Sequence, residues 1–341
     1  MIEDIELLHT VIHGHTAFEL LRTGLELDLF GHLEETGGLD LAGVAAALDT
    51  EEHAARVLLL GLASLRLLHK EGDTYRNAPL ARRCLLRGSP NYLGPRVEMQ
   101  RHVTNPGIGD LLESVRRNTN IGLRHLAGSG PTLYDRLAAH PEVQRVYYEN
   151  MGDASSKTFP LVAETYDFSS ARHVIDVGGG EATNALTLAR AHPHLQVTVF
   201  DLDEPLALAV RNIKDAGLED RVHTRAGDLF ADPLPEGADT VVFSHLFESW
   251  SPARNTELLR KCHDALPPGG SVLVYSFVSD DDNTGPLSAA FMSAYFLAIA
   301  TGEGMVPSGQ DISRCLVDAG FSRTERHDGV GFQHALIAGI K

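Results

Sequence analysis

The chain has 341 residues, 43% of them hydrophobic and 22% charged, and its 46 acidic against 29 basic residues give a formal net charge of −17. This composition predicts a soluble globular protein and excludes a disordered, collagen-like or membrane-bundle chain. The acidic balance argues against nucleic acid as a partner, because a phosphate backbone would be repelled.

The cysteines and the N-terminal sequence indicate in which cellular compartment the protein works. Cys84, Cys262 and Cys315 lie far apart and form neither a CxxC metal pattern nor a disulfide framework. The first ten residues, MIEDIELLHT, are acidic where a signal peptide is basic, and no apolar run approaches the length of a membrane span. We therefore predict a cytoplasmic protein that does not interact with membranes.

The apolar residues of the first half recur at helical spacing, as at Phe18, Leu21, Leu25 and Leu29. Residues 41–79 then have the pattern of helix, turn, helix and short hairpin that is typical of a winged helix. The second of these helices carries VLLLGLASL, whereas a recognition helix needs polar side chains that read bases. We interpret this region as a dimerisation module, and a DNA-binding regulator is the disfavoured alternative.

From Arg172 onward, short β-rich runs alternate with helices. The runs HVIDVG, QVTVFD, RVHTRA, DTVVFS and SVLVYSF predict a doubly wound, mostly parallel sheet, and SRTERHD and HALIAGI predict an antiparallel hairpin at its edge. A long helix from about Pro141 to Tyr166 would link the halves. The prediction is a helical, winged-helix-like domain over residues 1–165 and an α/β, Rossmann-like, seven-stranded domain over residues 166–341.

A glycine run follows the first predicted strand. The strand ends in Asp176 and Val177 and continues into Gly178–Gly180 and an amphipathic helix. Ligands of open parallel sheets bind at the carboxyl ends of the strands, where glycine lets the backbone approach them. A dinucleotide fingerprint needs a further glycine where this chain has Thr183. Asp176 suits instead the cationic amine of S-adenosylmethionine, which we predict as the cofactor.

The next two strands also end in carboxylates. Asp201 follows Gly180 by 21 residues, at the place where an acidic side chain accepts hydrogen bonds from ribose hydroxyls. Asp228 follows the third strand and can accept from the adenine amino group, with Leu229 beside the ring. Three acidic strand ends predict one cofactor site. Leu202, Ser244 and Trp250 complete the predicted cofactor residues.

Together these segments resemble the class I S-adenosylmethionine-dependent methyltransferases. The whole chain resembles the small-molecule O-methyltransferases of plants and actinobacteria, of the caffeate or hydroxyindole type, through YYENM, DVGGG, FDLDEP, GDLF, SHLFESW, LPPGG and VDAGF. The resemblance implies Gly178 and Gly180 at the methionine moiety, Asp201 at the ribose, Asp228 with Leu229 at the adenine, and S-adenosylhomocysteine as product. It also implies a homodimer formed through the N-terminal domain, which would serve as a substrate lid as well.

The segment SHLFESW departs from this family. The family has a His-Asp pair before the tryptophan, with the histidine as base, whereas this chain has Glu248 and Ser249 before Trp250. Methylation of a phenol needs a proton acceptor. Three explanations stay open: Glu248 is the base, a histidine such as His245 or His102 serves, or alignment alone suffices or methyl transfer is lost. We favour Glu248, because it occupies the motif position.

The acceptor site is predicted from residues near the strand ends. Arg101, in VEMQRHVTNP, would pair with a substrate carboxylate. No metal is predicted, because the consecutive carboxylates of SDDDN cannot all point at one ion and the histidines lack zinc-site spacing. The residues expected to surround an aromatic acceptor are Met151, Phe247, Trp250, Phe291, Met292, Tyr295 and Phe296.

The function that follows is methyl transfer from S-adenosylmethionine to the oxygen or the activated ring carbon of a small phenolic acceptor, in specialised metabolite or antibiotic biosynthesis. The alternative is an enzyme of the same fold that keeps the cofactor while catalysing a reaction other than methylation.

Overall fold

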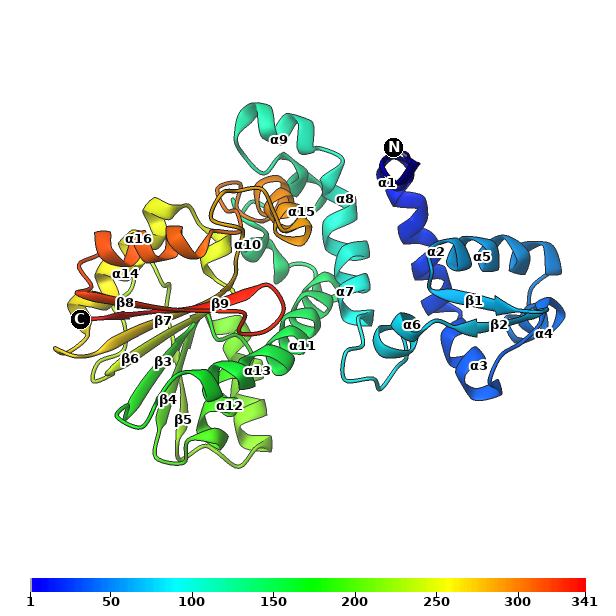
Figure 1. The fold of residues 1–341 in the computed structure, drawn as a ribbon. Helices are drawn as coiled ribbons and strands as arrows, with labels where there is room; N and C mark the ends of the chain where they lie inside the picture. Colours follow the sequence, from blue (N-terminus) through cyan, green and yellow to red (C-terminus); the bar gives the residue numbers. More distant parts are fainter. Residues whose placement is uncertain (1) are drawn as a thin grey trace. The chain divides into compact units, whose positions relative to one another are not determined.

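The computed structural model describes residues 2–341, with side chains from Ile5 onward, and divides the chain into two compact units (Figure 1). The first unit ends at Glu98 and the second spans Met99–Lys341. The sequence prediction groups residues 99–165 with the N-terminal half, whereas here they belong to the unit that contains the sheet. Their long helix α11 (Pro141–Thr165) packs against α12 (Thr183–Ala191) of the sheet domain.

The first unit is helical and carries one hairpin. Leu29, Phe30, Leu59 and Leu62 are buried in its core, and the hairpin follows the second helix of the winged-helix-like region as predicted. Its elements are α1 (Ile2–Ile12), α2 (Gly14–Glu26), α3 (Leu29–Thr36), α4 (Leu41–Ala47), α5 (Glu52–Ser64), β1 (Leu68–Glu71), β2 (Thr74–Asn77) and α6 (Pro79–Cys84), followed by α7 (Gly94–Met99).

The second unit begins with short helical segments that precede α11. Among the helices that the structure describes, none has the length and apolar character to cross a membrane. These segments are the π-helix η1 (Gln100–Thr104), α8 (Asn105–Ile108), α9 (Leu111–Arg117), the 3₁₀ helix η2 (Ile121–His125) and α10 (Leu133–Leu137).

A seven-stranded sheet forms the centre of the second unit, in the order β5-β4-β3-β6-β7-β9-β8. All pairs are parallel except those of β9, which is antiparallel to β7 and β8. The predicted α/β sheet and its antiparallel edge hairpin are therefore confirmed. The strands are β3 (His173–Val177), β4 (Gln196–Asp201), β5 (Val222–Ala226), β6 (Thr240–Ser244), β7 (Ser271–Phe277), β8 (Arg323–Asp328) and β9 (His334–Ile340).

Helices cover both faces of this sheet (Figure 1). Val174 packs with α11, α12 and α13 (Asp203–Asp215) on one face, whereas its neighbour Ile175 packs with α14 (Pro252–Ala265) and α16 (Gly309–Asp318) on the other. Successive side chains of a strand point to opposite faces, so strands buried on both faces are apolar throughout. This explains why runs such as TVVFS contain no apolar-polar alternation.

The strand order reverses at β3, and this reversal locates the site. From β3 the chain adds β4 and β5 on one side and then returns to place β6 on the other. In open sheets the ligand crevice lies at the carboxyl ends of the strands at such a reversal. The glycine run after β3 and the segment 244–250 after β6, which includes the 3₁₀ turn η3 (Phe247–Ser249), therefore flank one crevice.

Candidate active site

A cavity of about 410 Å³ opens at the carboxyl ends of β3, β4 and β6. Its volume falls within the ~300–1,000 Å³ typical of small-molecule sites. Most of the predicted cofactor residues border it, namely Gly178, Gly180, Asp201, Leu202, Asp228, Leu229, Ser244 and Trp250. The structure thus brings the three predicted strand ends together around one cavity.

The glycine run keeps its backbone open toward this cavity. Gly178 and Gly180 have φ values of 69° and 55°, in the left-handed region that favours glycine. A Cβ atom on Gly178 would lie 2.6 Å from Leu246 Cδ1, so a side chain there would require Leu246 to move as well. The Gly180 N–H donates to Asp201 Oδ2 at 2.8 Å and so ties the loop to the end of β4.

Two carboxylates are fixed at the cavity by their own backbone surroundings. Burial raises the pKa of Asp201, and the N–H groups of Gly180 and Leu202 offset part of this effect. Asp228 Oδ1 accepts from the Phe230 N–H at 2.7 Å, which holds that side chain within its loop. The cavity therefore presents preorganised hydrogen-bond acceptors that favour a ligand with hydroxyl groups or positive charge.

Asp176 lies beneath the glycine run and does not border the cavity. It is 1% exposed, and a Cβ atom on Gly179 would lie 2.5 Å from its Oδ2. Burial and, second, the negative charge of Asp201 raise the pKa of Asp176 to about 7, although hydrogen bonds from Asn184 and Ala185 oppose this. The role predicted for Asp176 is to orient the cofactor amine through water or backbone, and this stays a prediction, since the glycine run lies over the carboxylate.

Glu248 faces the protein interior. It is 1% exposed, does not border the cavity, and its Oε1 accepts from the Phe277 N–H at 3.0 Å. Burial alone would raise the pKa of Glu248, but the hydrogen bond and the charge of His245 outweigh it and lower that pKa. Glu248 is thus held as a carboxylate that interacts with His245, away from the place of a ligand.

His245 does border the cavity. Its side chain is 5% exposed, its Nδ1 lies 3.6 Å from Glu248 Oε1, and its buried Nε2 has no hydrogen-bond partner among the described residues. The backbone of His245 has a φ of 53°, which is unusual outside glycine. Such a strained residue is a feature of functional sites, and the unpartnered Nε2 makes His245 a candidate for the chemistry at this cavity.

The other predicted residues divide between the cavity and its surroundings. Met151 borders the cavity. Arg101 and His102 lie on the π-helix η1 and make contacts within the protein, and neither borders the cavity. Phe247 is buried against Phe243 in the sheet core.

Helix α15 (Leu287–Tyr295) and the π-helix η4 (Phe296–Ala300) carry the remaining predicted acceptor residues. Phe291 is 65% exposed, which separates it from the cavity. Met292 and Tyr295 pack beside the buried Phe296, behind the residues that border the cavity.

Sequence reasoning missed several residues of this cavity, among them Tyr134, Tyr147 and Ser249. The hydroxyl of Tyr134, on α10, lies 2.6 Å from Ser249 Oγ. The motif YYENM contains Tyr147 and could have identified it, but Met151 is the one residue of this motif among the predicted site residues. Tyr134 lies in no motif, and only the fold brings it to Ser249, 115 residues away in the chain.

Arg254 is a further residue of the cavity that sequence reasoning missed. Its guanidinium lies 3.6 Å from the ring centroid of Phe230 and 4.3 Å from that of Trp250, and it also donates to Glu303. A guanidinium over two aromatic faces stabilises that edge of the cavity.

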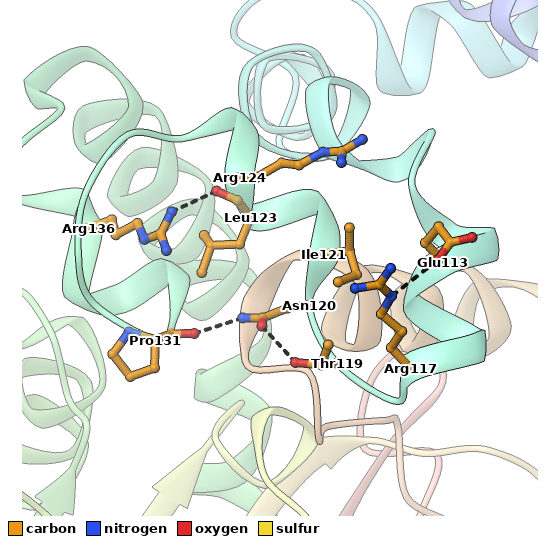
Figure 2. Close-up of a pocket in the computed structure, with 9 residues that line it drawn as sticks. All are labelled: Glu113, Arg117, Thr119, Asn120, Ile121, Leu123, Arg124, Pro131 and Arg136. Carbon is orange, nitrogen blue, oxygen red and sulfur yellow. Dashed lines mark hydrogen bonds and ion pairs between the residues drawn. The ribbon is translucent and has the colours of Figure 1, made fainter.

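A second cavity, of about 600 Å³, lies beside the loop 119–136 (Figure 2). It shares Pro131 with the first cavity. Figure 2 shows that Arg117 pairs with Glu113 and that Arg136 donates to the Leu123 carbonyl. The remaining charged residue, Arg124, pairs with Asp110, so these charged groups already have partners. We assign it no ligand.

The fold and the first cavity together are those of an S-adenosylmethionine-dependent methyltransferase. The cavity suits this cofactor, because the glycine backbone leaves room for it and the carboxylates offset the positive charges of its sulfonium and amine.

More narrowly, the chain belongs to the O-methyltransferase family: residues 109–322 match the O-methyltransferase domain and residues 10–87 the O-methyltransferase dimerisation domain. The predicted family, enzyme class and cofactor are confirmed.

Similar proteins cover nearly the whole chain. It is 35% identical to L-tyrosine C(3)-methyltransferase of Streptomyces lavendulae, over 99% of this chain and 93% of that protein. It is 34% identical to 3-hydroxy-5-methyl-1-naphthoate 3-O-methyltransferase of Streptomyces sahachiroi, over 98% and 95%. The crystal structure of the S-adenosylmethionine-dependent methyltransferase SibL superposes with a TM-score of 0.85 at 39% identity, covering 98% of each chain.

The human N-acetylserotonin methyltransferase, crystallised in complex with S-adenosylmethionine, gives a TM-score of 0.84 at 26% identity. The match covers 99% of this chain and 97% of the human one.

The protonation of Asp176 predicts a pH-dependent stability of the unliganded protein. Its folded pKa of about 7 exceeds the ordinary value of 3.8, so the native state keeps a proton that the unfolded state releases. Stability should therefore fall as pH rises from about 4 to about 7, by up to about 4 kcal/mol from this group. Asp176→Asn should remove this loss, so that the variant exceeds the wild type at pH 8 in urea unfolding.

The exposed Asp203→Asn variant is the control, since its unfolding curve should follow the wild type at every pH. If the free energies of unfolding of the wild type and of Asp176→Asn changed in parallel with pH, this role for Asp176 would be ruled out.

Proposed function

We propose that this enzyme methylates a small phenolic acceptor of specialised metabolism, at an oxygen or at a ring carbon activated by the phenolate. The similar proteins named above act, by their descriptions, on a tyrosine carbon and on a hydroxynaphthoate oxygen. Both positions become nucleophilic when the same phenol loses its proton. The observation that carries the proposal is the unpartnered His245 Nε2 at the cavity of the cofactor.

In this proposal the strand ends hold the cofactor. The backbone of Gly178 and Gly180 lies along the methionine moiety, Asp201 accepts from the ribose hydroxyls, and Asp228 with Leu229 binds the adenine. Their shared border with one cavity supports this assignment. When bound, S-adenosylmethionine supplies an electrophilic methyl group on a positively charged sulfur.

His245 then takes the acceptor proton on Nε2, and Glu248 orients it from the other side of the ring. A carboxylate that faces Nδ1 favours the tautomer with hydrogen on that atom, and it stabilises the imidazolium formed when Nε2 accepts a proton. The 3.6 Å separation of Nδ1 from Glu248 Oε1 and the burial of both groups support this pair. Glu248 thus keeps a part in the reaction, as a positioning residue rather than the base expected from its motif position.

Product analysis tests the function itself. Incubation with methyl-labelled S-adenosylmethionine and a panel of phenols, including L-tyrosine and hydroxynaphthoates, should yield a product one methyl heavier, with stoichiometric S-adenosylhomocysteine. NMR of the methyl carbon then separates a methoxy from an aryl-methyl product. Asp201→Ala should weaken S-adenosylhomocysteine binding in calorimetry at least about tenfold, the usual effect of losing a hydrogen bond to a charged group. Asp203→Ala is the matched control. Turnover that leaves S-adenosylmethionine unconsumed would reject methyl transfer.

Variants of the proposed pair should differ in a defined order. His245→Gln should lower kcat by about 10² to 10⁴, the usual contribution of a general base, with S-adenosylhomocysteine affinity unchanged. Glu248→Gln should cost less, because the base stays in place and only the carboxylate that orients it is lost. His223→Gln, on an exposed strand position, is the control. The reverse order, with Glu248→Gln inactive and His245→Gln near wild type, would return the base to Glu248.

We also propose that the enzyme is a homodimer and, from the cysteine pattern, that it works in the cytoplasm. The chain contains a dimerisation domain. Helix α1 leaves a row of apolar side chains exposed within its own unit, a feature that favours burial in a partner. These side chains are Ile5, Leu7, Leu8, Val11 and Ile12.

Charges on this row should prevent association. Leu8→Glu combined with Val11→Glu should convert a dimer into a monomer in light scattering, because unpaired carboxylates would be buried at the interface. Val317→Glu, on an equally exposed apolar position of α16, should remain dimeric. A monomeric wild type, or a dimeric double variant, would contradict the assignment of α1 to the interface.

A further inference from the structure

Three residues with hydroxyl groups, Tyr134, Tyr147 and Ser249, border the cavity, and a fourth, Tyr295, packs behind them; we name the four the hydroxyl cluster. Tyr134 and Ser249 lie 2.6 Å apart, and the rings of Tyr134 and Tyr147 meet edge to face with centroids 6.0 Å apart. Tyr295 packs against the same buried cluster as both tyrosines, and its buried hydroxyl has no hydrogen-bond partner among the described residues. Neither the family match nor the proposed proton acceptor gives these hydroxyls a role.

The surroundings keep the cluster protonated. Burial raises the pKa of Tyr134 to about 12, against the opposing effect of its hydrogen bonds to Ser249 and Tyr147. Burial also raises the pKa of Tyr147 and that of Tyr295 well above 10, and the negative charges of Glu248 and Asp201 act in the same direction on Tyr134 and Tyr147. At neutral pH every member is therefore a hydrogen-bond donor and none is a base.

A buried hydroxyl without a partner destabilises the folded protein. Native proteins keep such groups rarely, and often where a ligand completes the bond. Tyr295 does not itself border the cavity, but Tyr134 and Ser249 do, and their mutual hydrogen bond uses only one of their two hydroxyl hydrogens. The other hydrogen is available to a polar atom that arrives with the substrate.

The residues of the cluster and the cofactor residues come from different elements of the fold. The glycine run, Asp201 and Asp228 follow strands of the sheet, whereas the tyrosines come from α10, α11 and α15, outside the sheet. Ser249 belongs to the same short segment, 244–250, as His245, and both border the cavity. The cluster therefore lies beside the proposed proton acceptor.

We propose that the hydroxyl cluster is the binding site for the acceptor's phenolic oxygen and that it stabilises the phenolate by donating hydrogen bonds. Preorganised neutral donors aimed at an oxygen that gains charge are an effective way to lower a reaction barrier. His245 takes the phenolic proton, and the cluster holds the oxygen that loses it. The acceptor class is a phenol whose oxygen enters this site as a hydrogen-bond acceptor. This inference rests on the proposed function.

A phenol with a visible ionisation tests the cluster directly. The probe is 4-nitrophenol, bound to the full chain loaded with S-adenosylhomocysteine, and its absorbance reports the fraction of bound phenolate at each pH. Because hydrogen bonds to the charged form favour that form, Tyr134→Phe should raise the pKa of the bound probe by about one unit and weaken its binding about tenfold. Ser249→Ala and Tyr295→Phe should act in the same direction. Tyr166→Phe, which removes a half-buried hydroxyl away from the cavity, is the matched control.

The outcomes separate this inference from the proposed function. An unchanged probe pKa in Tyr134→Phe and Tyr295→Phe, or no binding of the probe to the wild type, would overturn the role of the cluster. His245→Gln should still bind the probe, since it leaves the donors in place. If S-adenosylhomocysteine does not bind, the proposed function fails, while titration of the unloaded protein still tests the cluster. Thermal unfolding of each variant shows whether a loss reflects folding instead.

Discussion

The reversal of strand order at β3 is the constraint on which the site depends. Because β4 and β6 lie on opposite sides of β3, the connections that follow β3 and β6 diverge and leave a crevice between them. The glycine run borders this crevice on one side and His245 on the other. The glycine run and His245 each come directly after a strand, and apolar packing on both faces holds these strands in place. The rigidity of the sheet therefore fixes the positions of these residues.

Two buried carboxylates near the crevice illustrate how a single charge takes different roles in different surroundings. Asp176 lies beneath the glycine run beside another acid, Asp201, and burial raises its pKa to about 7. Glu248 is equally buried but interacts with His245 and the Phe277 N–H, and its pKa is lowered. Near pH 7 a large fraction of Asp176 therefore keeps its proton, whereas Glu248 remains charged and can act on the imidazole of His245.

The sequence predicted the elements well, because each depends on local pattern. Two-sided burial makes the centres of TVVFS and SVLVYSF continuously apolar, and the glycine run after β3 predicts a turn at the end of that strand. Roles that depend on side-chain direction were harder to predict. Motif matching placed Glu248 at the acceptor, but Glu248 lies buried on the 3₁₀ turn η3 and does not border the cavity, whereas His245, whose φ is positive, does. The pairing of Tyr134 with Ser249 has no local signal at all.

These observations give a physical account of how the catalytic pair can depart from the family pattern without loss of the chemistry. A base and its orienting carboxylate must lie at a fixed separation, and the base must reach the acceptor. Neither residue needs a particular position in the chain. Residues 245 and 248 are joined by a single short turn, so the exchange of a histidine and a carboxylate between nearby positions retains both requirements. At position 249, where the family has an acid, this chain has a serine that bonds to Tyr134 instead. In the proposed mechanism, the buried pair of His245 and Glu248 and the neutral donors around Ser249 would together take the place of the family's charged pair.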